Sequence, residues 1–108
     1  MSWVSLCEIS ELSEGRGKYV EIEGFQIAVF LSEGRVFAMD NLCPHAGGSL
    51  FEGEIDHGCV VCPWHQWSFQ LGTGELRDAP GVMIGTYPTR MLERNGMPTL
   101  VQAEIPKF

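Results

Sequence analysis

Apolar and polar residues alternate along most of this chain, in short runs that end at turn residues. In residues 25–31 every odd position is apolar, which is the period of two expected of a β-strand with one buried face. The same pattern predicts strands at residues 3–9, 18–23, 35–39, 59–61, 67–71, 84–92 and 99–105, with a short strand around Ile55. The hydrophobic pattern therefore predicts strands from one end of the chain to the other.

Turn sequences separate these predicted strands. Ser32-Glu33-Gly34, Asp56-His57-Gly58 and Arg94-Asn95-Gly96 each stand between two of them. The last of these predicts a hairpin of residues 84–92 with residues 99–105. His57 is expected to be an exposed turn residue without a ligand role.

The predicted fold class is all-β. Residues 10–15 are the single helical candidate and are too short to form a packed helix. Six prolines and 13 glycines, spread along the chain, also favour short strands in an antiparallel sandwich or small barrel. With 108 residues the chain is expected to be one domain, 1–108, with a modest core.

Composition and charge exclude several classes of function. Hydrophobic residues make up 44% of the chain and charged residues 19%, so the chain is expected to fold. The formal charge is −7, and no basic patch with interleaved aromatic residues is present, which argues against nucleic-acid binding. The excess of acids has two interpretations. It provides ordinary solubility, or it forms an acidic face that steers the protein towards a basic patch on a redox partner.

The sequence predicts a cytoplasmic location without membrane association. No apolar run approaches the roughly 18 residues needed to span a bilayer. The opening MSWVSLCEISELSEG lacks the basic and apolar regions of a secretory signal. Two of the four cysteines, Cys7 and Cys59, are expected to be small buried apolar side chains that form no disulfide.

Two short clusters, Cys43-Pro44-His45 and Cys62-Pro63-Trp64-His65, contain residues suited to metal binding. Each provides one thiol and one imidazole, and 16 residues separate His45 from Cys62. A zinc finger groups its cysteines in one half and its histidines in the other, whereas here each half repeats Cys then His. A binuclear iron–sulfur cluster with two different irons needs this arrangement.

The pattern C-x-H, 16 residues, C-x2-H resembles the Rieske-type [2Fe–2S] domain, in which two histidines replace two cysteines on one iron. The flanking NLCPHAGGSL, VVCPWHQWSF and LGTGEL are similar to soluble members of that family, so the resemblance covers about residues 40–80. It implies that Cys43 and Cys62 bind the inner iron and that His45 and His65 bind the outer iron. It also implies a base formed by both termini, with a small cluster-binding lobe of about residues 41–80 inserted into it.

The resemblance extends to the surroundings of the cluster. Residues 78–81 are similar to a third loop that covers the cluster in this family. Trp64, Trp67 and Phe69 are expected to pack as an apolar wall that limits water near the cluster. High-potential membrane members have a serine and a tyrosine hydroxyl where Trp67 and Phe69 stand, and a disulfide at the positions of Gly48 and Trp64. The resemblance therefore implies a reduction potential nearer about −150 mV than about +300 mV.

One-electron transfer is the predicted activity. Two sulfides and two protein ligands per iron leave no open coordination position for substrate, and the chain has no Gly-rich nucleotide fingerprint. The resemblance implies a ferredoxin that is not an enzyme by itself. It would take an electron from a flavin-containing reductase and pass it to a terminal oxygenase.

Two alternatives remain open at this point. The chain has nearly the length of the small subunit of an assimilatory NAD(P)H nitrite reductase, and its two ligand clusters and Gly85-Thr86-Tyr87-Pro88 are similar to that family as well. The acceptor would then be a siroheme reductase. A structural zinc module that mediates binding is the second alternative, because tetrahedral zinc accepts two sulfurs and two nitrogens.

Overall fold

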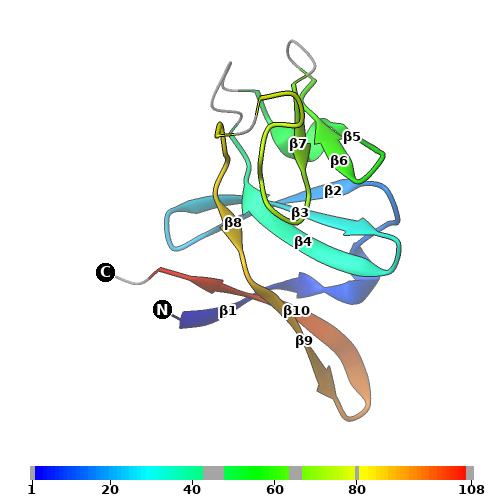
Figure 1. Ribbon diagram of the computed structural model, residues 1–108. Helices are drawn as coiled ribbons and strands as arrows, with labels where there is room; N and C mark the ends of the chain where they lie inside the picture. The colour runs from blue at the N-terminus through cyan, green and yellow to red at the C-terminus, as the bar shows by residue number, and fades with distance from the viewer. Residues whose placement is uncertain (1, 43–47, 64–66, 80, 107–108) are drawn as a thin grey trace.

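The computed structural model describes residues 2–42, 48–63, 67–79 and 81–106 (Figure 1). The described elements, in chain order, are β1 (Ser2–Glu8), the 3-10 turn η1 (Ile9–Glu11), β2 (Gly17–Ile22), β3 (Phe25–Ser32), β4 (Arg35–Asp40), the 3-10 turn η2 (Leu50–Glu52), β5 (Glu54–Asp56), β6 (Cys59–Val61), β7 (Ser68–Gln70), β8 (Thr86–Tyr87), β9 (Thr89–Arg94) and β10 (Met97–Ile105).

The described strands form three antiparallel sheets, which confirms the predicted all-β class. Their strand orders are β1-β10-β9, β2-β3-β4-β8 and β5-β6-β7. In Figure 1 the small β5-β6-β7 sheet lies above the β2-β3-β4-β8 sheet, and the β1-β10-β9 sheet lies below it. Two antiparallel hairpins, β2-β3 and β3-β4, make the centre of the molecule.

The central strand β3 is buried on both faces. Ile27 and Val29 pack into an apolar cluster with residues of β1 and β10, whereas Ala28 and Phe30 pack into a second cluster with residues of β6 and β7. All four side chains are 0% exposed. The sequence predicted only one apolar face for residues 25–31, and this was incomplete. The strand lies between two layers, so Ala28 and Phe30 at its even positions are apolar as well.

Tight turns with glycine join several strands, as predicted. Glu33-Gly34 and His57-Gly58 have positive φ at both residues, and Gly96 has a φ of 73° between β9 and β10. Two-residue turns of this hand fit the right-handed twist of the paired strands. The side chain of His57 is 76% exposed and lies 2.8 Å from Asp56 Oδ1, in agreement with its predicted place in a surface turn.

The predicted strand 84–92 is wrong as one element. Residues Thr86–Tyr87 pair with β4, and Thr89–Arg94 pair with β10. Pro88 stands between the two pairings, and because it has no N–H group it cannot continue a ladder on both sides. The chain therefore passes from one sheet to another at Pro88. The predicted hairpin with the last strand is confirmed through β9.

Two glycines stand where neighbouring backbone approaches closely. A Cβ on Gly17 would lie 2.5 Å from the Phe51 carbonyl oxygen and 2.6 Å from the Phe30 ring. A Cβ on Gly53 would lie 2.1 Å from the Val61 carbonyl oxygen. Contacts this short require backbone to move, so glycine at position 17 lets η2 lie close to β2, and glycine at position 53 lets the chain before β5 lie close to β6.

We expect Gly17→Ala to reduce the free energy of unfolding by about 1–3 kcal/mol, because the new methyl group overpacks a contact with the backbone of Phe51. Gly72→Ala is the matched control. No atom lies within 4 Å of a Cβ there, so a change within about 0.5 kcal/mol is expected. Thermal unfolding followed by circular dichroism measures both variants, and equal effects would contradict the role of this contact.

The cysteines outside the predicted ligand set behave as expected. Cys7 and Cys59 are buried and form no disulfide. Burial, with a smaller contribution from the Glu11 carboxylate, raises the pKa of Cys7 to about 11. Burial also raises the pKa of Cys59. Both side chains therefore stay protonated thiols.

No helix in the described part of the chain has the length and apolar character to cross a membrane.

Candidate metal centre

The second predicted ligand loop leaves β6 at Cys62. This side chain is 0% exposed and belongs to the apolar cluster of the small sheet, together with Phe69 and Leu50. The Cys62 N–H donates a hydrogen bond of 2.7 Å to the Trp67 carbonyl oxygen. The main chain is thus closed across the two ends of the loop, and the Cys62 thiol is anchored in the core.

The first predicted ligand loop is closed in the same way. Leu42 and Ser49 form an isolated antiparallel bridge. The Leu50 N–H donates to the Asn41 carbonyl oxygen at 2.8 Å. We call residues 41–42 and 49–51 the neck of the first loop. The neck brings together the chain segments on either side of residues 43–48.

The third loop, predicted at residues 78–81, also starts from this core. The Leu76 N–H donates to the Val82 carbonyl oxygen at 2.8 Å and closes the loop. Ala79 packs against the same apolar cluster that contains Cys62. The described flanks of all three loops lie at the upper end of the molecule in Figure 1. One apolar cluster therefore supports the three loops that the sequence assigned to a metal cluster.

Three of the four predicted ligands, Cys43, His45 and His65, lie outside the described residues. Cys62 is the predicted ligand that the structure describes. In the described ranges, no group of three or more His, Cys, Asp or Glu side chains could hold a metal ion. Trp64 and Pro80 lie outside the description as well.

The predicted packing of Trp67 and Phe69 is confirmed. Phe69 is 0% exposed, and Trp67 is partly buried against the same cluster. Their ring centroids are 6.4 Å apart with an interplanar angle of 48°. These rings form an apolar support directly after the second loop.

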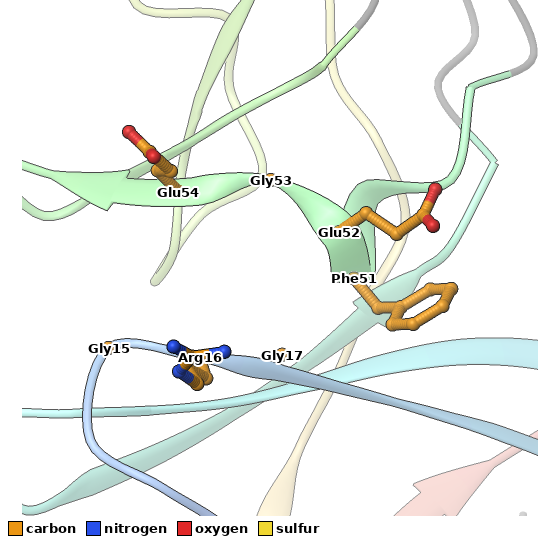
Figure 2. Close-up of a pocket in the computed structure, with 7 residues that line it drawn as sticks. All are labelled: Gly15, Arg16, Gly17, Phe51, Glu52, Gly53 and Glu54. Atoms are coloured by element: carbon orange, nitrogen blue, oxygen red, sulfur yellow. The ribbon is translucent and has the colours of Figure 1, made fainter.

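Two surface hollows border the small sheet. A cleft of about 480 Å³ lies between the Gly15–Gly17 segment and residues 51–54. Figure 2 shows the residues that line it, among which the Glu54 side chain points away from Arg16. A second groove of about 530 Å³ is lined by residues 52–56 together with Val61, Cys62 and Pro63. The first hollow contains neither thiol nor imidazole. The second reaches Cys62, so it is the hollow that adjoins the candidate centre.

Comparison with known proteins identifies the family. The model of the Rieske [2Fe-2S] domain matches residues 2–88, which include both ligand clusters. The chain belongs to the Rieske [2Fe-2S] domain family. The ferredoxin component of the naphthalene 1,2-dioxygenase system of Pseudomonas putida is 33% identical to it over 92 residues, which are 84% of this chain and 88% of that protein.

Solved structures of Rieske proteins have the same fold. The ferredoxin of Sphingomonas yanoikuyae B1 matches with a TM-score of 0.82 and 31% identity, over 97% of this chain and 100% of the other. A Mycobacterium tuberculosis protein assigned as an NADH-dependent nitrite reductase small subunit matches with a TM-score of 0.84 and 28% identity, over 98% and 97%. The resemblance inferred from the two ligand clusters is thereby confirmed.

The described residues of this Rieske domain fit a [2Fe–2S] cluster. A buried cysteine in an apolar cluster, next to a groove, suits the sulfur-ligated iron, and the sequence supplies a second thiol and two imidazoles on closed loops. Apolar packing beneath the loops limits the approach of water.

Sequence reasoning missed a pair that supports the Rieske site. The Tyr87 hydroxyl donates to Asp40 Oδ1, and the Asp40 N–H donates to the Gly85 carbonyl oxygen at 2.9 Å. Burial is the larger cause that raises the pKa of Tyr87, and the Asp40 carboxylate is the smaller one. The hydroxyl therefore stays a donor. The pair joins the end of β4, just before the first loop, to the chain that follows the third loop. Its members are 47 residues apart, and no local pattern signals such a contact.

Proposed function

We propose that this chain is a Rieske ferredoxin that carries single electrons between proteins and is not an enzyme by itself. The observation that carries this proposal is its similarity to the naphthalene dioxygenase ferredoxin component, which extends over most of both chains. A small domain with closed ligand loops on one apolar cluster suits a carrier, because a rigid site changes little between oxidation states.

The proposed ligands are Cys43 and Cys62 for the inner iron and His45 and His65 for the outer iron. Support comes from the family match, from the buried position of Cys62 and from the main-chain bonds that close both loops. When bound, the cluster supplies one reversible electron. The chain's own residues hold the four donors and exclude water from the thiolate side.

We also propose one domain, 1–108, in which the cluster-binding lobe of about residues 41–80 is inserted into the base. The separate β5-β6-β7 sheet supports this division, and an apolar cluster shared with β3 and β4 joins it to the base. A cytoplasmic location is part of the proposal. Binding of nucleic acid or of a membrane is not.

The proposed partners are a flavin-containing reductase as donor and a terminal oxygenase as acceptor. A solved complex of oxygenase and ferredoxin in carbazole 1,9a-dioxygenase contains a chain of this fold, with a TM-score of 0.79 and 25% identity. The formal charge of −7 supports docking to a basic patch on such a partner.

A second candidate function is the small subunit of an assimilatory nitrite reductase, with a siroheme reductase as the acceptor. The match to the Mycobacterium tuberculosis protein over nearly all of both chains favours this candidate. Electron delivery distinguishes the two: the reduced protein is mixed with an oxygenase or with a siroheme subunit, and reoxidation of the visible spectrum is followed. The structural zinc module gains no support from the family match.

The cofactor has a direct test. Purified protein is expected to be reddish-brown, with about two irons and two acid-labile sulfides per chain, and to take up one electron at a potential nearer about −150 mV than about +300 mV. The low value is expected because neither Trp67 nor Phe69 offers a hydroxyl to stabilise the reduced cluster. A redox titration followed by electron paramagnetic resonance (EPR) measures it. Colourless protein containing zinc, or two equivalent irons, would refute the assignment.

A further inference from the structure

One buried polar side chain stands at the entrance to the first ligand loop. Asn41 directly follows β4 and is 2% exposed, and it is the one polar or charged residue that is buried in the described part of the chain. Burial of an amide is costly unless hydrogen bonds replace the water it loses. Its partners therefore indicate what the residue does.

Asn41 makes three hydrogen bonds, one to β3 and two to η2. Its N–H donates to the Gln26 carbonyl oxygen at 2.9 Å. Its carbonyl oxygen accepts from the Leu50 N–H at 2.8 Å, and its side-chain Oδ1 accepts from the Phe51 N–H at 3.0 Å. Two of these bonds cross the neck of the first loop, and only the bond to Phe51 depends on the identity of the side chain.

The side chain of Asn41 performs a task that the local sequence leaves undone. The short turn η2 begins after Ser49, which is in the N-cap position but makes no side-chain capping hydrogen bond. The first N–H groups of such a turn need acceptors from outside it. Asn41 supplies two acceptors from the opposite side of the neck. The amide thereby couples the chain entering the loop to the chain leaving it.

The neck is connected to the second ligand loop through the core. Leu50, whose N–H bonds to Asn41, is 0% exposed and lies in the same apolar cluster as Cys62. A neck held by Asn41 therefore keeps a fixed relation to the buried thiol of the other loop. If the neck opened, the two ends of the first loop would lose this connection.

We propose that Asn41 is a positioning residue for the metal centre. Its side-chain bond to Phe51 holds together the two ends of the first loop, to which the proposed ligands Cys43 and His45 belong. The proposal rests on the ligand set given under the proposed function. It assigns Asn41 no direct contact with the cluster.

The test compares release of the metal from purified variants at a temperature where all of them are folded. Asn41→Ala removes the Oδ1 acceptor and leaves the Phe51 N–H unpaired, so iron release to a chromogenic chelator should be faster by about tenfold or more. Asn41→Asp keeps an oxygen at the same place and should release iron near the wild-type rate. The EPR g values of the reduced protein should shift in Asn41→Ala and stay close to wild type in Asn41→Asp.

Thr89→Val is the matched control. It also removes one side-chain bond to a main-chain group, the 3.1 Å bond from Thr89 Oγ1 to the Val36 carbonyl oxygen, but in the base of the molecule. Wild-type release and wild-type EPR are expected. Equal release from Asn41→Ala and Thr89→Val, or unchanged g values in Asn41→Ala, would overturn the proposal. If Asn41→Ala does not fold, Asn41→Ser takes its place, because its shorter side chain cannot reach Phe51 N from the same position.

The proposed function and this inference fail in different ways. Wild-type protein that contains zinc would refute the proposed function. The role of Asn41 could still be tested, because release of zinc to a chromogenic chelator can be compared among the same variants. If the wild-type protein contains a Rieske cluster, but iron release and the EPR g values do not change in the Asn41 variants, only the proposed role of Asn41 is refuted.

Discussion

Cys62→Ala should abolish the visible spectrum and leave almost no iron in the purified protein. The substitution removes one of the two proposed thiolate ligands, and a four-ligand binuclear centre does not assemble stably on three. Cys62 lies in the core that supports both loops. Iron and sulfide analysis, with the absorption spectrum, measures the loss. His45→Ala should give the same result.

Cys59→Ala is the matched control for this prediction. Cys59 is also a buried cysteine of the β6 segment, only three residues before Cys62. Burial raises its pKa, which keeps it a protonated thiol, whereas a cysteine ligand must be a thiolate. The control should keep full colour. Loss of the cluster in Cys59→Ala together with its retention in Cys62→Ala would show that the ligand assignment is wrong.

The parts of this fold that were predictable depend on residues close together in sequence. The turns at Glu33-Gly34 and His57-Gly58 were predicted because two residues with glycine determine a tight turn. The ligand clusters were recognised for the same reason, since their chemistry and spacing lie within two short segments. Local chemistry was sufficient in both cases.

The parts that were missed depend on which layers pack together. Ala28 and Phe30 face a second apolar layer that a period of two in a single strand cannot reveal. Pro88 marks a change of sheet, but the local sequence does not tell that Thr86–Tyr87 pairs with β4 and Thr89–Arg94 with β10. Asn41 precedes a ligand cluster in the sequence, yet its partner Phe51 is known only from the folded neck. Such features follow from tertiary packing rather than from local pattern.

Truncation of the aromatic ring beneath the loops should have the second-largest effect. Phe69 is 0% exposed on β7 and shares an apolar cluster with Cys62 and Leu50. Phe69→Ala removes a large buried ring and is expected to cost about 3–5 kcal/mol. That is a large part of the roughly 5–15 kcal/mol by which a domain is stable. The Tm should fall by more than about 10 °C, and the cluster should be lost at lower temperature than in the wild type.

Two further variants distinguish support of the metal centre from general packing of the core. Phe37→Ala removes the same ring from a residue that packs against the same cluster but is only partly buried, with Arg35 5.4 Å above the ring. Its fall in Tm should be clearly smaller. Phe69→Leu refills most of the space and should recover much of the Tm. Thermal bleaching of the visible spectrum measures loss of the cluster, and circular dichroism measures unfolding of the chain. Bleaching well below unfolding in Phe69→Ala would mean that this core holds the ligand loops more than it holds the sheets, whereas equal effects of both Phe→Ala variants would contradict a special role for Phe69.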